Sequence, residues 1–588
     1  MVDHPYRLRV QITRKARAGT WAQAVFPEAV LRETLARLGS VELTVTIHPL
    51  VGKIQLSSAT GTLRLPALGD SDTLALDLVV ASAGAFSLRV CIYYGTVLLQ
   101  SVAFEGAAGQ HAAEPGTVRS TLDYAASADF MSLGQHEQPD VTIWSNQAAD
   151  GTHWFGVFTG GATQSCLGLT NGGLQPLTTG DLESVAGSLR DALTSVLMRP
   201  AQAKPDPRHA STKQGRAYRF DPPVPADDAE RGERLQQLVS LALAGWDAYN
   251  GLFPGLTSTQ SPAASAVGGL LAIARCHPER VNIAWAALYD YHLSKDPAPS
   301  ACEVFAEQLR TGQDLLDRPQ DCRARPGCPL GDVRRRDRTV CPFGFWGLRH
   351  RIEQPPHHIA PPAEGQIKDE MDVERASGLK TAITRPGGNP VRLGIAWWPH
   401  FDERVKHHLE MLDELGAAER ESDRDRILAL LARGQKQIYY FFCHGEGENL
   451  TFELIVGPGE HDAITVGDLN DDRYTWSADG PAPLVFLNGC DTTAFRGDTI
   501  NKFLTRFRAM GASGVIGTEI PVHTYLAEDV GKRVLAALAA GHPLGNAFLA
   551  LRRDLLRTQI NPLGLAYSFF ASARLHVCEG AACHVCTP

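Results

Sequence analysis

The sequence predicts an α/β protein, in which a mainly parallel sheet flanked by helices is preceded by an N-terminal β-sandwich and a small α+β unit. Three observations predict this class. Alternating apolar residues dominate the N-terminal part, a Pro-rich stretch interrupts the chain, and short apolar runs alternate with helical patterns after it. At 588 residues the chain is too long for one hydrophobic core, because single cores stop growing at roughly 250–300 residues.

The N-terminal part alternates as half-buried strands do. Residues 41–47 place Val, Leu, Val and Ile at every second position, and residues 74–80 and 86–92 repeat the pattern. Short turns rich in Gly, Asp and Ser separate these runs, as at 69–72. The pattern predicts a β-sandwich-like domain over residues 1–118.

A different pattern follows. Strand-like runs at 141–144 and 154–158 precede a helical stretch whose apolar residues recur at spacings of three and four, namely Leu182, Val185, Leu189, Leu193 and Val196. We expect a small α+β unit over residues 119–200. Residues 201–228 are rich in Pro and charged side chains, which disfavour regular structure, so we expect a linker there.

The remaining chain, residues 229–588, predicts one larger domain. It starts with a helical pattern that places Leu235, Leu238, Val239, Trp246 and Tyr249 on one side. Four strand-like runs interleaved with helical patterns come later, at 391–398, 437–442, 484–488 and 514–518. Such alternation predicts a parallel sheet flanked by helices.

Composition excludes several function classes. The net charge is −9 and no block of Lys and Arg stands out, so direct nucleic-acid binding is not expected. Apolar runs fall short of the roughly 18 residues that a membrane helix needs, and the N-terminus does not resemble a signal peptide. We therefore expect a cytoplasmic protein without membrane contacts, whose 12 cysteines are thiols, metal ligands or catalysts rather than disulfides.

Two of the buried strands end in small-residue turns that carry one half of a nucleophilic pair. His444 follows the run at 437–442, and Cys490 follows the run at 484–488. Neighbouring parallel strands would bring both side chains to one edge of the sheet, where an imidazole can raise the thiolate fraction of a cysteine. The sequence predicts a His444/Cys490 dyad, with the amides of Gly445 and Cys490 as oxyanion donors. Each motif alone is equally typical of a turn or of a small core residue.

Five segments carry a family resemblance: FFCHGEG at 441–447, VFLNGCDTT at 485–493, GASGVIGTEIPV at 511–522, NPLGLAYSFF at 561–570 and VNIAWAALYD at 281–290. They resemble the CHAT domains, caspase-like modules of clan CD that are related to separase and gingipain-type peptidases. The resemblance covers about residues 229–577, and the 46-residue separation of His444 and Cys490 is close to the roughly 50 residues found in caspases.

The resemblance implies a bacterial cysteine endopeptidase that needs no cofactor for catalysis. His444 would be the general base or ion-pair partner, Cys490 would form an acyl-enzyme, and Trp285 would be a buried aromatic. The chain has Asn488 and Gly489 where caspases have Gln and Ala. It also has Ile520 and Thr524 where many relatives have Trp and Asp, so the preference for a basic residue before the cleaved bond, which is common among the relatives, does not carry over to this chain from the resemblance.

Two carboxylates are candidates for substrate binding. Glu519 follows the strand-like run at 514–518, and Asp491 follows Cys490. Either could pair with a Lys or Arg side chain of a substrate. The alternative is that they cap helices or lie in solvent.

Four cysteines are candidates for a structural zinc site: Cys302, Cys322, Cys328 and Cys341. They lie in a polar, Pro-rich stretch that a metal would help to order. Their spacings do not match compact CxxC pairs, and free thiols are the alternative.

The leading hypothesis is therefore a cysteine endopeptidase that cleaves a partner protein, with the N-terminal region binding that protein or a regulatory partner. The second hypothesis is a catalytically inactive caspase-like scaffold or interaction protein. A third is an acyltransferase or esterase that uses the same dyad.

Overall fold

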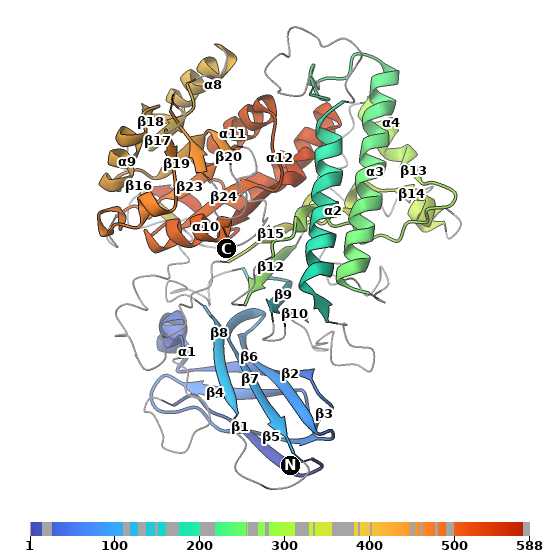
Figure 1. The fold of residues 1–588 in the computed structure, drawn as a ribbon, viewed down its shortest axis with the longest axis vertical. Coiled ribbons are helices and arrows are strands. Elements are labelled where there is room, and N and C mark those ends of the chain that lie inside the picture. The colour runs from blue at the N-terminus through green and yellow to red at the C-terminus, as the bar shows by residue number, and fades with distance from the viewer. Residues whose placement is uncertain are drawn as a thin grey trace.

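The chain is described by a computed structural model, and Figure 1 shows its fold. The described residues are 2–13, 26–109, 118–126, 137–147, 151–159, 176–199, 218–254, 256, 261, 269–276, 281–311, 328–332, 335–355, 382–385, 389–399, 403–446, 453–457, 459, 462–476, 480–489 and 499–579.

The N-terminal part is a β-sandwich, as predicted, but its last strand begins at Arg119, beyond the predicted domain boundary at residue 118. One sheet has the order β4-β2-β6-β7-β8 and the other the order β1-β5-β3, with antiparallel neighbours throughout. The strands are β1 (Pro5–Val10), β2 (Ser40–Val51), β3 (Ile54–Leu56), β4 (Thr60–Pro66), β5 (Leu74–Val80), β6 (Gly84–Tyr94), β7 (Val97–Ala108) and β8 (Arg119–Ala125), with α1 (Arg32–Leu38) beside them. Their inward-facing residues form one continuous apolar core.

A buried ion pair joins two strands of the five-stranded sheet, on either side of β7. Arg89 on β6 and Asp123 on β8 are almost fully buried and lie 2.6 Å apart through Arg89 Nη2 and an Asp123 oxygen. Arg89 Nη1 donates to Asp123 and to the Ser101 hydroxyl, and the guanidinium lies 4.9 Å from the ring centre of Trp144. Trp144 belongs to the next sheet, so this charged cluster contacts the boundary between the two parts.

A central sheet with the order β11-β10-β9-β12-β15 follows the sandwich. Its strands are β9 (Val141–Gln147), β10 (Thr152–Thr159), β11 (Leu177–Thr178), β12 (Leu270–Arg275) and β15 (Arg351–Glu353). β12 pairs in parallel with β9, with Leu271 opposite Val141, and in parallel with β15 on its other side. The sheet therefore combines strands from both sides of the Pro-rich stretch at 201–228.

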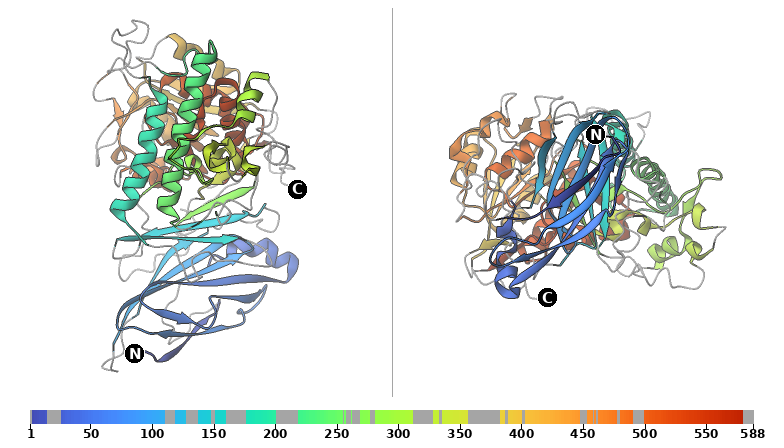
Figure 2. Two further views of the ribbon diagram at one scale, coloured as in Figure 1. Left: turned by 90° about the vertical axis from the view of Figure 1, so that its right-hand side faces the viewer. Right: turned by 90° about the horizontal axis from the view of Figure 1, so that it is seen from below.

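The two faces of the central sheet pack against different partners. Trp144, Phe158 and Cys276 join the core of the sandwich. Alternate residues such as Ile143 and Ile273 point the other way, toward helices α2 (Thr179–Leu197) and α3 (Asp228–Leu252). Figure 2 shows the sandwich on one side of these strands and the helices on the other. The apolar face predicted for α2 is confirmed, and a Thr178–Asp181 capping box begins that helix.

The C-terminal part contains a six-stranded sheet with the order β18-β17-β19-β23-β24-β25. The strands are β17 (Val391–Trp397), β18 (Gly416–Glu421), β19 (Ile438–Phe442), β23 (Leu484–Leu487), β24 (Gly514–Thr518) and β25 (Tyr567–Phe570). All neighbours are parallel except β25, which runs antiparallel to β24. The predicted α/β class and mainly parallel sheet are confirmed.

Helices cover both faces of this sheet. The core on one face includes α9 (Arg424–Arg433) and α10 (Thr499–Ala509), with Phe441 and Leu487 contributed by the strands. The core on the other face includes α8 (Glu403–Asp413), α11 (Thr524–Ala539) and α12 (Leu544–Gln559), and it is continuous with the core around α2 and α3. Because the strands are buried on both faces, their sequences are unbroken apolar runs.

Shorter elements complete the described chain: α4 (Glu303–Thr311), α6 (Trp346–Arg349), the pair β13 (Ser300–Ala301) and β14 (Thr339–Val340), the pair β16 (Ala382–Arg385) and β26 (His576–Glu579), and the sheet of β20 (His444–Glu446), β21 (Glu453–Ile455) and β22 (Ala463–Ile464). Among the described helices, none has the length and apolar character needed to cross a bilayer.

The Asp123→Ala variant tests the buried ion pair. Removing the carboxylate leaves the Arg89 guanidinium buried without its charge partner, so we expect unfolding to become easier by about 3–5 kcal/mol. Denaturant unfolding measures this change. The matched control is Asp77→Ala, which breaks the exposed Arg7–Asp77 pair and should leave the midpoint almost unchanged. Equal effects of the two variants would contradict this account.

Candidate active site

The strands that precede His444 and Cys490 are neighbours in the sheet, as predicted. β19 and β23 pair in parallel over four residue pairs, from Ile438 opposite Leu484 to Phe441 opposite Leu487. Every pair is offset by 46 residues along the chain (484 − 438 and 487 − 441). The carboxyl ends of both strands therefore meet at one edge of the sheet, where open α/β sheets bind ligands.

The described chain stops short of part of the predicted site. His444 and Gly445 begin β20, which leaves the six-stranded sheet and pairs with β21, with Gly445 opposite Leu454. Cys490 and Asp491 lie outside the described residues. The His444/Cys490 dyad and the oxyanion donors at Gly445 and Cys490 therefore remain predictions.

Hydrogen bonds fix the last two described residues before Cys490. The backbone N–H of Asn488 donates to the Phe441 carbonyl of β19 at 2.8 Å. The Thr518 hydroxyl at the end of β24 donates to the Gly489 carbonyl at 2.7 Å. The end of β23 is thus attached to the strand on either side of it.

Glu519 lies at the same edge of the sheet but has internal partners. Its side chain is fully buried, and one carboxylate oxygen accepts hydrogen bonds from Asn282 at 2.8 Å and Ser568 at 2.6 Å. The other oxygen lies 3.3 Å from Arg190 Nη2 on α2. A cationic substrate side chain would have to compete with Arg190 here, and substrate binding by Glu519 remains a prediction.

Sequence reasoning missed Arg190 and Asn282. A signal for Arg190 was present, because this charged residue stands on the apolar face of the predicted helix, between Leu189 and Leu193. A charge in that position needs a buried partner. Trp285, three residues after Asn282, is 3% exposed, which confirms the expected buried aromatic.

The candidate zinc ligands are only partly described. Cys302, Cys328 and Cys341 are buried, and burial raises the pKa of the Cys302 thiol, whereas Cys322 lies outside the described residues. Across the described ranges, no group of three or more His, Cys, Asp or Glu side chains is placed to hold a metal ion. Zinc binding by these four cysteines remains a prediction.

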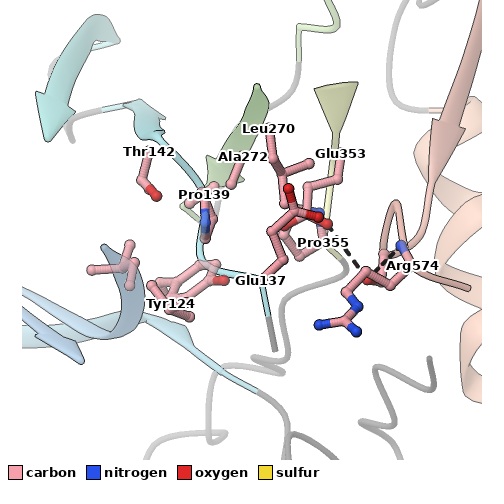
Figure 3. Close-up of a pocket in the computed structure, with 13 residues that line it drawn as sticks. Tyr124, Glu137, Pro139, Thr142, Leu270, Ala272, Glu353, Pro355 and Arg574 are labelled. Carbon is pink, nitrogen blue, oxygen red and sulfur yellow. Dashed lines mark hydrogen bonds between the residues drawn. The ribbon is translucent and has the colours of Figure 1, made fainter. Parts of the chain in front are cut away.

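A second buried carboxylate lies in a pocket between the three parts of the chain. Glu353 at the end of β15 accepts a hydrogen bond from the Ala573 N–H at 2.9 Å. Figure 3 shows Tyr124 of the sandwich on one side of the pocket and Arg574 of the C-terminal part on the other. Burial raises the pKa of Glu353 to about 7, with Arg351 opposing this shift and Glu137 adding to it.

Comparison with known proteins finds a peptidase family that matches the part of the chain containing this candidate site. Residues 396–573 match peptidase family C25. This range contains β19, β23 and β24 together with His444 and Cys490. The C25 match supports a clan CD peptidase domain in this part of the chain, and membership of the CHAT domains remains a prediction.

One curated relative is a protein named as a probable protease from Vitiosangium sp. (strain GDMCC 1.1324), which is 27% identical over 514 residues. That match covers 84% of this chain but 62% of the relative, so the chain spans about three-fifths of its length.

Two solved structures are also similar. The separase–securin complex of Saccharomyces cerevisiae overlaps 73% of this chain and 30% of the other, with a TM-score of 0.35 and 9% identity. The complex of the pro- and mature domains of Porphyromonas gingivalis RgpB overlaps 39% of this chain and 56% of the other, with a TM-score of 0.26 and 12% identity. Both overlaps are partial, and the strand order of this chain itself defines its fold.

Glu353 gives stability a specific pH dependence. Because the pKa of this carboxyl is raised from 4.5 to about 7 in the folded state, the folded chain binds more protons than the unfolded chain between these values. Its contribution to stability is present below pH 4.5 and is lost as the pH rises through 7. We expect Glu353→Gln to gain about 2–3 kcal/mol relative to the unsubstituted chain between pH 5 and pH 8.

Thermal or denaturant unfolding at several pH values measures this gain. Glu303→Gln is the matched control, since this exposed carboxylate beside Arg335 does not line the Glu353 pocket and its loss should leave the slope between pH 5 and pH 8 in place. A Glu353→Gln chain whose stability keeps the original slope would rule out Glu353 as its source.

Proposed function

We propose that this chain is a cysteine endopeptidase that cleaves a partner protein through a His444/Cys490 dyad. The observation that carries the proposal is the register of β19 and β23, whose offset of 46 residues equals the separation of the dyad residues (490 − 444). Phe441 and Leu487 are paired, and His444 and Cys490 each come three residues later, so both residues follow strand ends that lie about 4.8 Å apart.

Side-chain alternation supports the same arrangement. Tyr440 and Phe442 of β19 face the core that contains α11, and so does Phe486 of β23. His444 comes two residues after Phe442 and Cys490 four residues after Phe486, and we infer from this even spacing that both side chains approach that same face. The C25 match spans both strands and both residues, and it supports the peptidase assignment independently of the register.

The proposed reaction follows from the chemistry of the two side chains. His444 takes the thiol proton, and the Cys490 sulfur attacks the carbonyl carbon of the scissile peptide bond. The tetrahedral intermediate collapses by breaking the C–N bond, and the leaving amine takes the proton from His444. Water then attacks the resulting thioester, which releases the carboxylic acid and restores the thiol.

Backbone amides would stabilise the charge that develops on the substrate oxygen. The amides of Gly445 and Cys490 are the proposed donors, since each residue follows the carboxyl end of one of the two neighbouring strands β19 and β23. Asp491 is a proposed contact for a basic substrate side chain. Neither the dyad nor these contacts uses a cofactor.

The N-terminal region has a proposed role in recognition or regulation. The sandwich shares its core with Trp144 and Phe158 of the central sheet, whose other face packs against the core of the C-terminal part. A protein bound to the sandwich would therefore be held at a fixed position relative to the proposed site. This arrangement suits an enzyme that acts on a folded partner.

Cys490→Ala and His444→Ala test the proposed function. The purified full chain is incubated with a proteome-derived protein mixture, and new N-termini are identified by mass spectrometry. We expect each variant to lower the cleavage rate by roughly 10³-fold or more, because removal of either member of a nucleophile–base pair disables the unit.

The matched control is Cys443→Ala, which removes the thiol next to His444. Cys443 is buried in the core around α9 and α10, so its loss should reduce stability slightly and leave cleavage intact. Cleavage that survives Cys490→Ala would reject this nucleophile. A chain that cleaves nothing and whose Cys490 shows no selective reaction with iodoacetamide would instead be the inactive scaffold.

A further inference from the structure

A buried hydrogen-bond network surrounds Asn488, two residues before Cys490. The Asn488 side chain is 1% exposed. Its Nδ2 donates to the Ala527 carbonyl of α11 at 2.7 Å and to the Tyr440 hydroxyl of β19 at 2.8 Å. Its Oδ1 accepts from the Tyr567 hydroxyl of β25 at 2.9 Å. One amide thus joins three strands and a helix.

The directions of the three side-chain hydrogen bonds of Asn488 are determined. A carbonyl only accepts, so the Ala527 carbonyl fixes which end of the Asn488 amide carries the hydrogens. Tyr440 accepts one of these hydrogens and lies 3.1 Å from Nε2 of the buried His408 on α8. Burial lowers the pKa of His408 to about 4, so its ring is neutral at pH 7 and Nε2 can accept the Tyr440 proton.

Gly531 on α11 leaves the space that the network occupies. A Cβ atom at this position would lie 2.3 Å from the Tyr440 hydroxyl and 3.0 Å from Asn488 Nδ2. Glycine in a helix interior costs about 0.5–1 kcal/mol relative to alanine. Its presence here allows the helix to approach both strands, and any side chain would displace Tyr440 or Asn488.

We propose that Asn488 is a positioning residue, which holds the strand end before Cys490 in fixed relation to the strand before His444. This inference rests on the proposed function. Asn488 contacts β19 twice, through its backbone N–H to Phe441 and through its side chain to Tyr440, while Thr518 holds the adjacent Gly489 carbonyl from β24. The network therefore acts on the alignment of sulfur and imidazole rather than on the substrate.

Alkylation of Cys490 measures this alignment directly. The full chain is treated with iodoacetamide from pH 5 to pH 9, and carboxamidomethylation of the Cys490 peptide is quantified by mass spectrometry. A thiol aligned with His444 should react with an apparent pKa below the free value of about 8.5. We expect Tyr440→Phe and Gly531→Ala to raise that apparent pKa, with about tenfold slower labelling at pH 6–7 per unit of rise.

The chain offers a matched control for each variant. Tyr439→Phe removes a hydroxyl from the adjacent residue of β19, which faces the opposite core and donates to the Leu430 carbonyl at 3.3 Å. Gly232→Ala adds a methyl group to a glycine of α3 that has nothing within 4 Å of its Cβ position. Both controls should keep the labelling profile of the unsubstituted chain, although Tyr439→Phe should lose stability much as Tyr440→Phe does.

The outcomes separate the two proposals. If the unsubstituted chain labels Cys490 no faster than the His444→Ala chain at any pH, the proposed dyad fails. If labelling depends on His444 but the profile is unchanged in folded Tyr440→Phe and Gly531→Ala chains, the dyad stands and the positioning role is wrong. If the Gly531→Ala chain does not fold, the Tyr440→Phe chain alone tests the positioning role. This variant removes only one oxygen atom and is expected to fold. If the chain cleaves a test peptide, the positioning role also requires that Tyr440→Phe and Gly531→Ala lower kcat and leave KM unchanged.

Discussion

The parallel pairing of β19 with β23 is the constraint on which the rest of the C-terminal part depends. Both strands are buried on both faces, so a slip of one residue would exchange every side chain between two different cores. Tyr439 stacks on Trp476 on one face, while Tyr440 bonds to Asn488 on the other. These contacts permit one register, and that register determines which residues stand side by side at the strand ends.

The sequence predicts helices and strands well where the pattern of apolar residues within the segment is sufficient. Alternation predicts the strands of the sandwich, and the helical pattern around Leu189 predicts α2. The central sheet shows the limit of such reasoning. Leu271 of β12 lies opposite Val141 of β9, 130 residues earlier, and Ile352 of the three-residue β15 lies on its other side. Periodicity reports which face of a strand is apolar and carries no information about its partner.

The same limit applies at the candidate site. Small residues after two apolar runs locate the strand ends, because turns have a local composition. The partners of Glu519 could not be found in this way, since Arg190 is 329 residues away and Asn282 is 237 residues away. Asn488 is hidden for a different reason: an Asn before a Gly is typical of an ordinary turn. Its role depends on Tyr440, Tyr567 and Ala527, which meet only in the folded chain.

The central sheet has a consequence for how the polypeptide can be divided. Its first three strands precede the Pro-rich stretch and its last two follow it, and β9 and β12 are joined side by side. Proteolysis between residues 200 and 217 would therefore produce two fragments that share one sheet and two cores, and they should stay associated. Nicking would change the covalent connectivity without releasing the amino-terminal third of the chain.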